Sequence, residues 1–236
     1  MCKNQFNTRI HITIKMEKNR IFGLVMGGAC QYQDMSGLTR LLTSLHECQG
    51  FDPTDQLERY GPDRGDPLFR TAAVALYYRR PEYYQECLQE SLGACYVTCP
   101  EEAVADVCQL YGALLHGVLN GLTRPQLLDT RYYPEHLAML LNVPSSGPES
   151  LTDIRAVFQA LIYIFFTSNS YREGVTRIRR AYPGHDVLAG AYGQLAGAYY
   201  GLTDIPLEWM NQAPELDEEL MDILEEYVQM QKIKTI

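Results

Sequence analysis

Residues 184–201 read GHDVLAGAYGQLAGAYYG. A short His-Asp turn opens this stretch, and glycines then recur every fourth residue at Gly193, Gly197 and Gly201. A glycine inside a helix costs about 1 kcal/mol relative to alanine, so three on one face need a structural reason. The spacing therefore predicts a buried helix whose small face lies directly against the backbone of a neighbouring helix.

A second small face identifies the neighbour. Gly23 and Gly27 are also four residues apart, in a predicted helix over residues 21–29, and such spacing puts both on one side of the helix. A membrane helix is a poor alternative for residues 184–201, because the run falls short of ~20 apolar residues and acidic sequence follows it. We expect the two glycine faces to pack together in a tight bundle.

Capping and periodicity signals predict further helices over residues 37–48, 68–78, 154–166 and 215–226, and a long helix that ends at Leu119. The predicted N-terminal signals are Asp34 and Ser36, Asp66 with Pro67, and two capping boxes, Thr98-x-x-Glu101 and Ser150-x-x-Asp153. Residues 142–148 read as a loop. With about ten helices and no fixed-period repeat, the chain is predicted to be all-α, a single multi-helical bundle rather than a solenoid.

The first fifteen residues depart from this helical pattern. Residues 9–15 alternate as a short strand does, and Met16 offers a second possible start. We interpret residues 1–15 as an N-terminal extension, disordered or paired at an edge, without functional weight. The helical domain is then expected to span residues 16–236.

Composition limits the classes of partner and compartment. The chain has 236 residues, 46% of them hydrophobic, and a net charge of -9, which argues against nucleic acid or an anionic membrane as a partner. Its seven cysteines form no CxxC pair and follow no secretory signal, so they are expected to be reduced, in a cytoplasmic protein. Cys95 and Cys99, one helical turn apart, are more consistent with core packing than with chelation.

Few polar groups are arranged for chemistry. The chain has no G-x-S-x-G elbow, Walker loop, dinucleotide fingerprint or HExxH motif. Asp34 and Asp186 each precede a predicted helix, and two converging carboxylates can hold a hard cation such as Mg²⁺. Each alone is more often an N-cap. His185 is either a base or substrate-orienting group, or an ordinary surface histidine in a turn.

Several segments, in order along the chain, resemble the ADP-ribosylglycohydrolase family. Residues 20–27 are similar to its opening helix, and residues 32–36 (YQDMS) look like its Trp-Thr-Asp-Asp-Thr motif. Residues 64–70 resemble its Gly-Asn-Gly loop ending in Met-Arg, and residues 184–187 fall where it has Asp-x-Asp-Thr. The resemblance extends from residue 20 to about 226 and is most specific over residues 189–209, which close with Tyr-Tyr-Gly-Leu, Ile-Pro and Trp.

This resemblance implies a set of site residues and a chemistry. Family members use the two acidic motifs to hold a pair of Mg²⁺ ions, which position the ribose of ADP-ribose for cleavage of its glycosidic bond. By resemblance, Asp34 and Asp186 are the catalytic and metal-binding residues. The expected ligand-binding residues are Ser36, Gly65, Asp66 and His185.

The departures from the family pattern concern the same motifs. The first motif keeps only Asp34, with Met35 in place of its second Asp, and the second keeps only Asp186, with Gly184 in place of its first Asp. Because the affinity for divalent ions rises with the number of carboxylates, Mg²⁺ binding is expected to be weak or lost.

Three functions are compatible with these motifs. The leading hypothesis is a non-catalytic relative with an eroded metal site, which binds an ADP-ribose-like ligand or an ADP-ribosylated or other protein partner. The alternative is an active Mg²⁺-dependent hydrolase of ADP-ribosyl bonds that uses Asp34 and Asp186. A structural helical protein with a closed pocket is the third.

Overall fold

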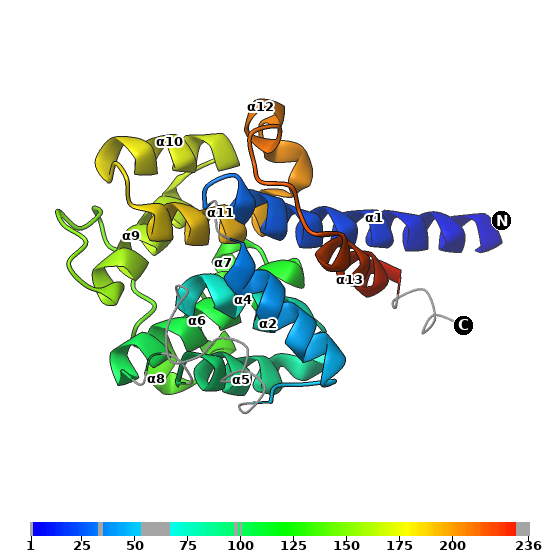
Figure 1. The fold of residues 1–236 in the computed structure, drawn as a ribbon, viewed down its shortest axis with the longest axis horizontal. Helices are drawn as coiled ribbons and strands as arrows, with labels where there is room; N and C mark the ends of the chain where they lie inside the picture. The colour runs from blue at the N-terminus through cyan, green and yellow to red at the C-terminus, as the bar shows by residue number, and fades with distance from the viewer. Residues whose placement is uncertain (1, 33–34, 53–66, 97–98, 100, 230–236) are drawn as a thin grey trace.

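The computed structural model describes residues 2–32, 35–52, 67–96, 99 and 101–229. These residues form helices, turns and coil and no strand, which confirms the all-α class (Figure 1). The α-helices are α1 (Cys2–Ala29), α2 (Ser36–Glu47), α4 (Pro67–Tyr77), α5 (Tyr84–Tyr96), α6 (Glu102–Leu119), α7 (Arg124–Leu127), α8 (Glu135–Ala138), α9 (Ile154–Thr167), α10 (Tyr171–Ala181), α11 (Asp186–Tyr200), α12 (Leu207–Met210) and α13 (Glu218–Gln229). The short 3-10 helices are η1 (Pro81–Tyr83), η2 (Thr130–Tyr132) and η3 (Leu202–Asp204).

Helices α1 and α11 pack backbone to backbone through their glycines, as predicted. A Cβ placed on Gly197 would lie 2.0 Å from the carbonyl oxygen of Gly23, and one placed on Gly193 would lie 2.1 Å from that of Gly27. Real Cβ atoms essentially never approach another atom within 3.0 Å. The glycines are therefore required by the distance between the two helices.

Gly201 has a different role from the one that its spacing predicts. It is the C-cap of α11, with φ +86°, and a Cβ there would overlap the side chain of Asn19. A positive φ favours glycine because it has no Cβ. The third glycine of the series thus ends the helix instead of extending its small face.

The strand-like interpretation of residues 9–15 is wrong. These residues belong to α1, whose N-terminal part projects beyond α13 in Figure 1. A helix that is already formed extends at little cost, because each added residue gains one hydrogen bond, whereas a lone alternating segment gains nothing without a partner strand. The domain boundary at residue 15 remains a prediction.

Two of the predicted caps are shifted. Met35 is the N-cap of α2 and makes no side-chain cap bond, so Ser36 is the first helical residue and does not cap the helix. The buried Met35 side chain joins the core, which explains an apolar residue at this position. Asp34, the other predicted cap, lies outside the described residues.

The two capping boxes also begin later than predicted. Asp153 itself is the N-cap of α9, and its carboxylate accepts a hydrogen bond from the backbone N–H of Ala156 at 2.9 Å. Glu101 is the N-cap of α6, and Thr98 lies outside the described residues. Pro67 opens α4 as predicted, while Asp66 lies outside the described part.

Helix α6 lies at the centre of the core, and nearly all of its side chains are buried. Its Tyr111 hydroxyl donates to the carbonyl of Ala191 at 2.8 Å, and the side chain of Gln194 donates to the carbonyl of Phe69 at 3.0 Å. These bonds connect α6 and α4 to α11. No described helix has the length and apolar character needed to cross a bilayer.

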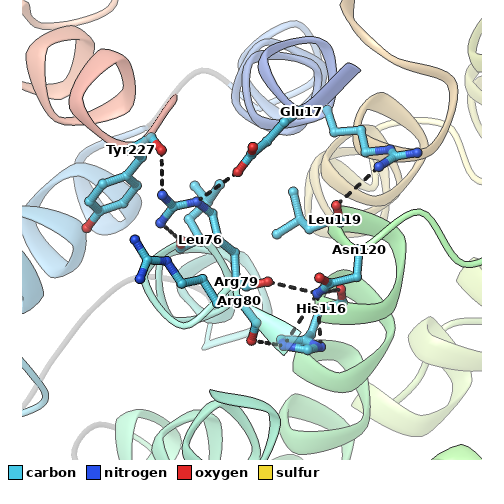
Figure 2. A network of polar contacts seen from close by, with 9 residues as sticks. Glu17, Leu76, Arg79, Arg80, His116, Leu119, Asn120 and Tyr227 are labelled. Atoms are coloured by element: carbon cyan, nitrogen blue, oxygen red, sulfur yellow. Dashed lines mark hydrogen bonds and ion pairs between the residues drawn. The ribbon is translucent and has the colours of Figure 1, made fainter. Parts of the chain in front are cut away.

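The predicted acidic C-terminal helix forms as α13, but it begins at Glu218 and not at Glu215. Its apolar positions Leu220, Ile223, Leu224 and Tyr227 are buried, and acidic side chains such as Asp222 and Glu225 are exposed. Figure 2 shows how the end of α4 holds it. The Arg79 side chain, 6% exposed, donates to the Tyr227 carbonyl at 2.6 Å, and its Nε lies 3.5 Å from a carboxylate oxygen of Glu17 in α1.

The same network contains a buried histidine. His116 in α6 is 3% exposed, with Nε2 2.9 Å from the Arg80 carbonyl and Nδ1 3.0 Å from the Tyr132 hydroxyl. A carbonyl only accepts hydrogen bonds, so we infer that Nε2 carries the hydrogen and that Nδ1 accepts from Tyr132. Burial lowers the pKa of His116, although its bond to the Arg80 carbonyl opposes this shift. The neutral ring is the form that the fold accommodates.

This lowered pKa predicts loss of stability in acid. In the unfolded chain His116 takes up a proton near pH ~6.5, whereas the folded protein keeps it neutral to a lower pH. The free energy of unfolding should fall as pH drops from ~6.5 through the folded pKa, by about 1.4 kcal/mol per unit of lowering. Urea unfolding at several pH values should show a shallower fall for His116→Gln. Equal slopes for His116→Gln and wild type would contradict the prediction.

Candidate functional site

Three segments that flank the predicted motifs meet at one place. Tyr32 follows the end of α1 by three residues, and its Cβ lies 2.8 Å from where a Cβ on Gly190 of α11 would be. The Tyr32 ring centroid is 4.7 Å from that of Phe69 in α4. Asp34 follows Tyr32 by two residues, Gly65 and Asp66 shortly precede Phe69, and Asp186 lies one helical turn before Gly190. Asp34, Gly65 and Asp66 themselves lie outside the described residues. The fold thus brings the neighbours of all three motifs together.

His185 has a structural role. It is the N-cap of α11, and its Nδ1 accepts a hydrogen bond from the backbone N–H of Leu188 at 3.2 Å. A ring nitrogen that accepts this bond has its lone pair occupied, so Nδ1 does not serve as a base or metal ligand in this arrangement. The N-cap predicted for Asp186 is therefore supplied by the preceding residue.

Asp186 is the first residue of α11 and is exposed. The partial positive charge of the helix N-terminus favours a carboxylate at this position. Ser36 is likewise exposed, at the first position of α2. Both candidate residues therefore begin helices at the surface, and neither is buried in a closed pocket.

Sequence reasoning did not select Arg70, a buried cation beside this region. Its side chain packs against the start of α2, where a Cβ on Gly37 would lie 3.1 Å from Arg70 Cγ. A signal was present, since Arg70 ends the segment that resembles the family's Met-Arg loop. Its position beside the candidate motifs makes Arg70 a candidate ligand-binding or positioning residue.

The nearest cysteine is not a nucleophile. Burial raises the pKa of Cys30, which follows α1 directly, to about 11, although the charge of Arg179 opposes this. The thiol is therefore protonated at neutral pH, and a thiol is a much weaker nucleophile than a thiolate.

The described donors do not fit a pair of magnesium ions. Mg²⁺ prefers oxygen ligands in an octahedral arrangement. Within the described part of the two acidic motifs, Asp186 is the one carboxylate, and Met35 contributes a buried apolar side chain. Among the described residues no group of three or more His, Cys, Asp or Glu side chains is placed to hold a metal ion.

The order of the motifs, the glycine-packed helix pair and the junction of α1, α4 and α11 together identify the fold. The sequence model of the family described as ADP-ribosylglycohydrolase matches residues 35–234. The chain belongs to this family. This confirms the family resemblance. The match begins at Met35, so the assignment of residues 32–36 and 184–187 to the family's two acidic motifs remains a prediction.

Two relatives give the same result over part of the chain. The chain is 27% identical over 159 residues to the ADP-ribosylarginine hydrolase Tri1 of Pseudomonas putida (strain GB-1), covering 61% of this chain and 40% of that protein. It is 24% identical over 121 residues to the ADP-ribosylarginine hydrolase Tri1 of Serratia proteamaculans (strain 568), covering 48% and 33%. The matched regions span less than half the length of either relative.

A solved structure extends the likeness to the whole fold. It is described as an ADP-ribosylglycohydrolase-related protein complex, and it superposes with a TM-score of 0.67 at 22% identity. The superposition covers 92% of this chain and 98% of that chain. At this identity the likeness supports a shared fold.

Proposed function

We propose that this ADP-ribosylglycohydrolase family member binds an ADP-ribose-type ligand, free or attached to a protein, without hydrolysing it. The composition of the second acidic motif carries the proposal. Gly184 stands where the family has an aspartate, so Asp186 is the one carboxylate of residues 184–187. The Nδ1 of His185 is occupied by the cap of α11 and adds no ligand. A divalent ion held by so few anionic oxygens would be bound weakly.

The binding half of the proposal rests on the retained scaffold. Residues 189–209 of this chain keep the family's pattern. Helix α11 packs so closely against α1 that the N-terminus of α11 has a fixed position. The exposed Asp186 is then available to accept hydrogen bonds from ligand hydroxyl groups. We place this activity in the cytoplasm, on the basis of the cysteine usage.

Calorimetric titration of ADP-ribose into the full chain, with and without Mg²⁺, tests the proposal. Binding is expected in both conditions with similar affinity. Asp186→Ala should weaken it about tenfold or more, since a hydrogen bond to a charged group contributes about 1.5–3 kcal/mol. Asp222→Ala removes an equal charge from the exposed face of α13 and should leave the affinity unchanged.

Two results would overturn the proposal. Release of ADP-ribose from ADP-ribosylarginine that requires Mg²⁺ would establish the hydrolase alternative, which the names of the two relatives, both ADP-ribosylarginine hydrolases, favour. If ADP-ribose does not bind with Mg²⁺ or without it, the protein is a helical scaffold whose pocket has closed.

A further inference from the structure

A cavity of about 490 Å³ lies between α9, α10 and the loop before α9. It is lined by Gly147, Glu149, Tyr163, Arg177, Arg180 and Tyr182, among others. None of its lining residues belongs to residues 32–36, 64–70 or 184–187. Its volume is in the range of small-molecule sites.

The wall of the cavity is preformed. The Tyr182 hydroxyl donates to the carbonyl of Pro148 at 2.6 Å and holds the loop against the end of α10. Gly147 is required in that loop, because a Cβ there would lie 2.6 Å from the Tyr182 oxygen and 3.2 Å from the Tyr163 ring. The loop therefore packs on two tyrosines at the closest distance that a residue without a side chain allows.

Arg177 is held in a defined orientation by neutral groups. Its guanidinium lies over the Tyr163 ring, 5.2 Å from the centroid, and Nη1 donates to the hydroxyls of Thr167 at 2.9 Å and Ser168 at 3.1 Å. No carboxylate among the described residues pairs with it. The charge of Arg177 is positioned but is not neutralised by an anion.

Arg180 adds a second charge, one helical turn along α10. Its side chain is exposed, and the described residues offer its guanidinium no hydrogen-bond acceptor or ion-pair partner. Glu149, exposed at the rim, is the one carboxylate among the lining residues and makes no ion pair with either arginine. The cavity is thus net positive in a chain whose net charge is -9.

We propose that this cavity binds the phosphate groups of a small phosphorylated molecule. Two guanidinium groups present planar sets of N–H donors, which match phosphate oxygens in pairs. The Tyr163 ring is covered on one side by Arg177 and is contacted by Gly147, so base stacking on it is not offered and the charged groups provide the recognition. The inference is independent of the ADP-ribose proposal, because the residues differ.

Calorimetric titration of pyrophosphate into the full chain tests this site. Binding is expected, stronger at low than at physiological ionic strength. Arg177→Gln and Arg180→Gln should each weaken it about tenfold, the effect of losing one charge-assisted hydrogen bond. Arg155→Gln is the matched control: it removes the same charge from the exposed face of α9, outside the cavity, and should leave the affinity unchanged.

The outcomes separate the two proposals. Pyrophosphate binding that needs both arginines and persists in Asp186→Ala supports the cavity. Pyrophosphate binding that both arginine variants leave unchanged overturns the cavity, and ADP-ribose binding that Asp186→Ala weakens then leaves the ADP-ribose site standing. If pyrophosphate does not bind, or if citrate binds through both arginines as tightly as pyrophosphate does, the assignment of phosphate as the ligand is overturned.

Discussion

Replacing Gly197 with alanine is expected to lower the free energy of unfolding by about 3 kcal/mol or more. The added Cβ would lie 2.0 Å from the Gly23 carbonyl oxygen and 3.1 Å from Gly27 Cα, both on the backbone of α1. Neither atom can move as a flexible side chain does, so α1 and α11 must separate along their contact. Separation would also disturb the junction with α4, because Gln194 on α11 donates to the Phe69 carbonyl.

Urea unfolding followed by circular dichroism measures this effect, and Gly93→Ala is the control. Gly93 lies inside α5, where a Cβ would be 3.2 Å from the edge of the Phe51 ring, a side chain that can shift. Alanine is the better helix former by about 1 kcal/mol, so this variant should be neutral or slightly more stable. A Gly197→Ala protein as stable as the wild type would show that the two backbones are farther apart than described.

The packing of α1 against α11 through their glycines was predictable, because glycines inside a helix lower its stability and need a structural reason. Gly193 and Gly197 weaken a helix unless a close neighbour requires them, and Gly23 and Gly27 repeat the same spacing. The role of Gly201 was not predictable from spacing, because a glycine four residues after Gly197 can lie inside the helix or end it. The strand prediction for residues 9–15 was wrong because alternation is a local pattern, whereas a strand also needs a partner strand elsewhere in the fold.

The candidate site was predictable only in part. Motif order led to the family assignment, whereas the junction of the segments next to Asp34, Asp66 and Asp186 was not predicted from the sequence. The cap formed by His185 depends on backbone angles of φ -90° and ψ 81°, which the residue type does not specify. The cavity between α9 and α10 depends on how a loop packs against Tyr182, a tertiary contact without a local signal.

Replacing Arg79 with methionine is expected to cost about 3–5 kcal/mol, the range for breaking one side of a buried ion pair. Arg79 donates to the carbonyls of Tyr227 and Leu76, and its guanidinium lies over the Tyr227 ring at 4.4 Å (Figure 2). Its loss would leave the carboxylate of Glu17, 12% exposed, without its closest opposite charge. Helix α13 would also lose its hydrogen bond to the end of α4.

Lower pH should reduce this loss. Burial already raises the pKa of Glu17, although the charge of Arg79 opposes the shift, so without Arg79 the folded pKa should rise further. A raised carboxyl pKa gives stability that is fully present below the unfolded pKa of ~4.3 and is lost as pH rises through the folded pKa. The difference between Arg79→Met and wild type should therefore be larger at neutral than at acidic pH.

A double-mutant cycle separates the charge from the packing. Glu17→Gln removes the unpaired carboxylate, so Glu17→Gln/Arg79→Met should recover part of the stability lost in Arg79→Met. The exposed pair of Arg131 with Asp129 is the control, and Arg131→Met should change stability little because solvent screens a surface ion pair. If the double variant is no more stable than Arg79→Met at neutral pH, the ion pair with Glu17 does not contribute. Arg79 then stabilises the fold through its hydrogen bonds to the Tyr227 and Leu76 carbonyls.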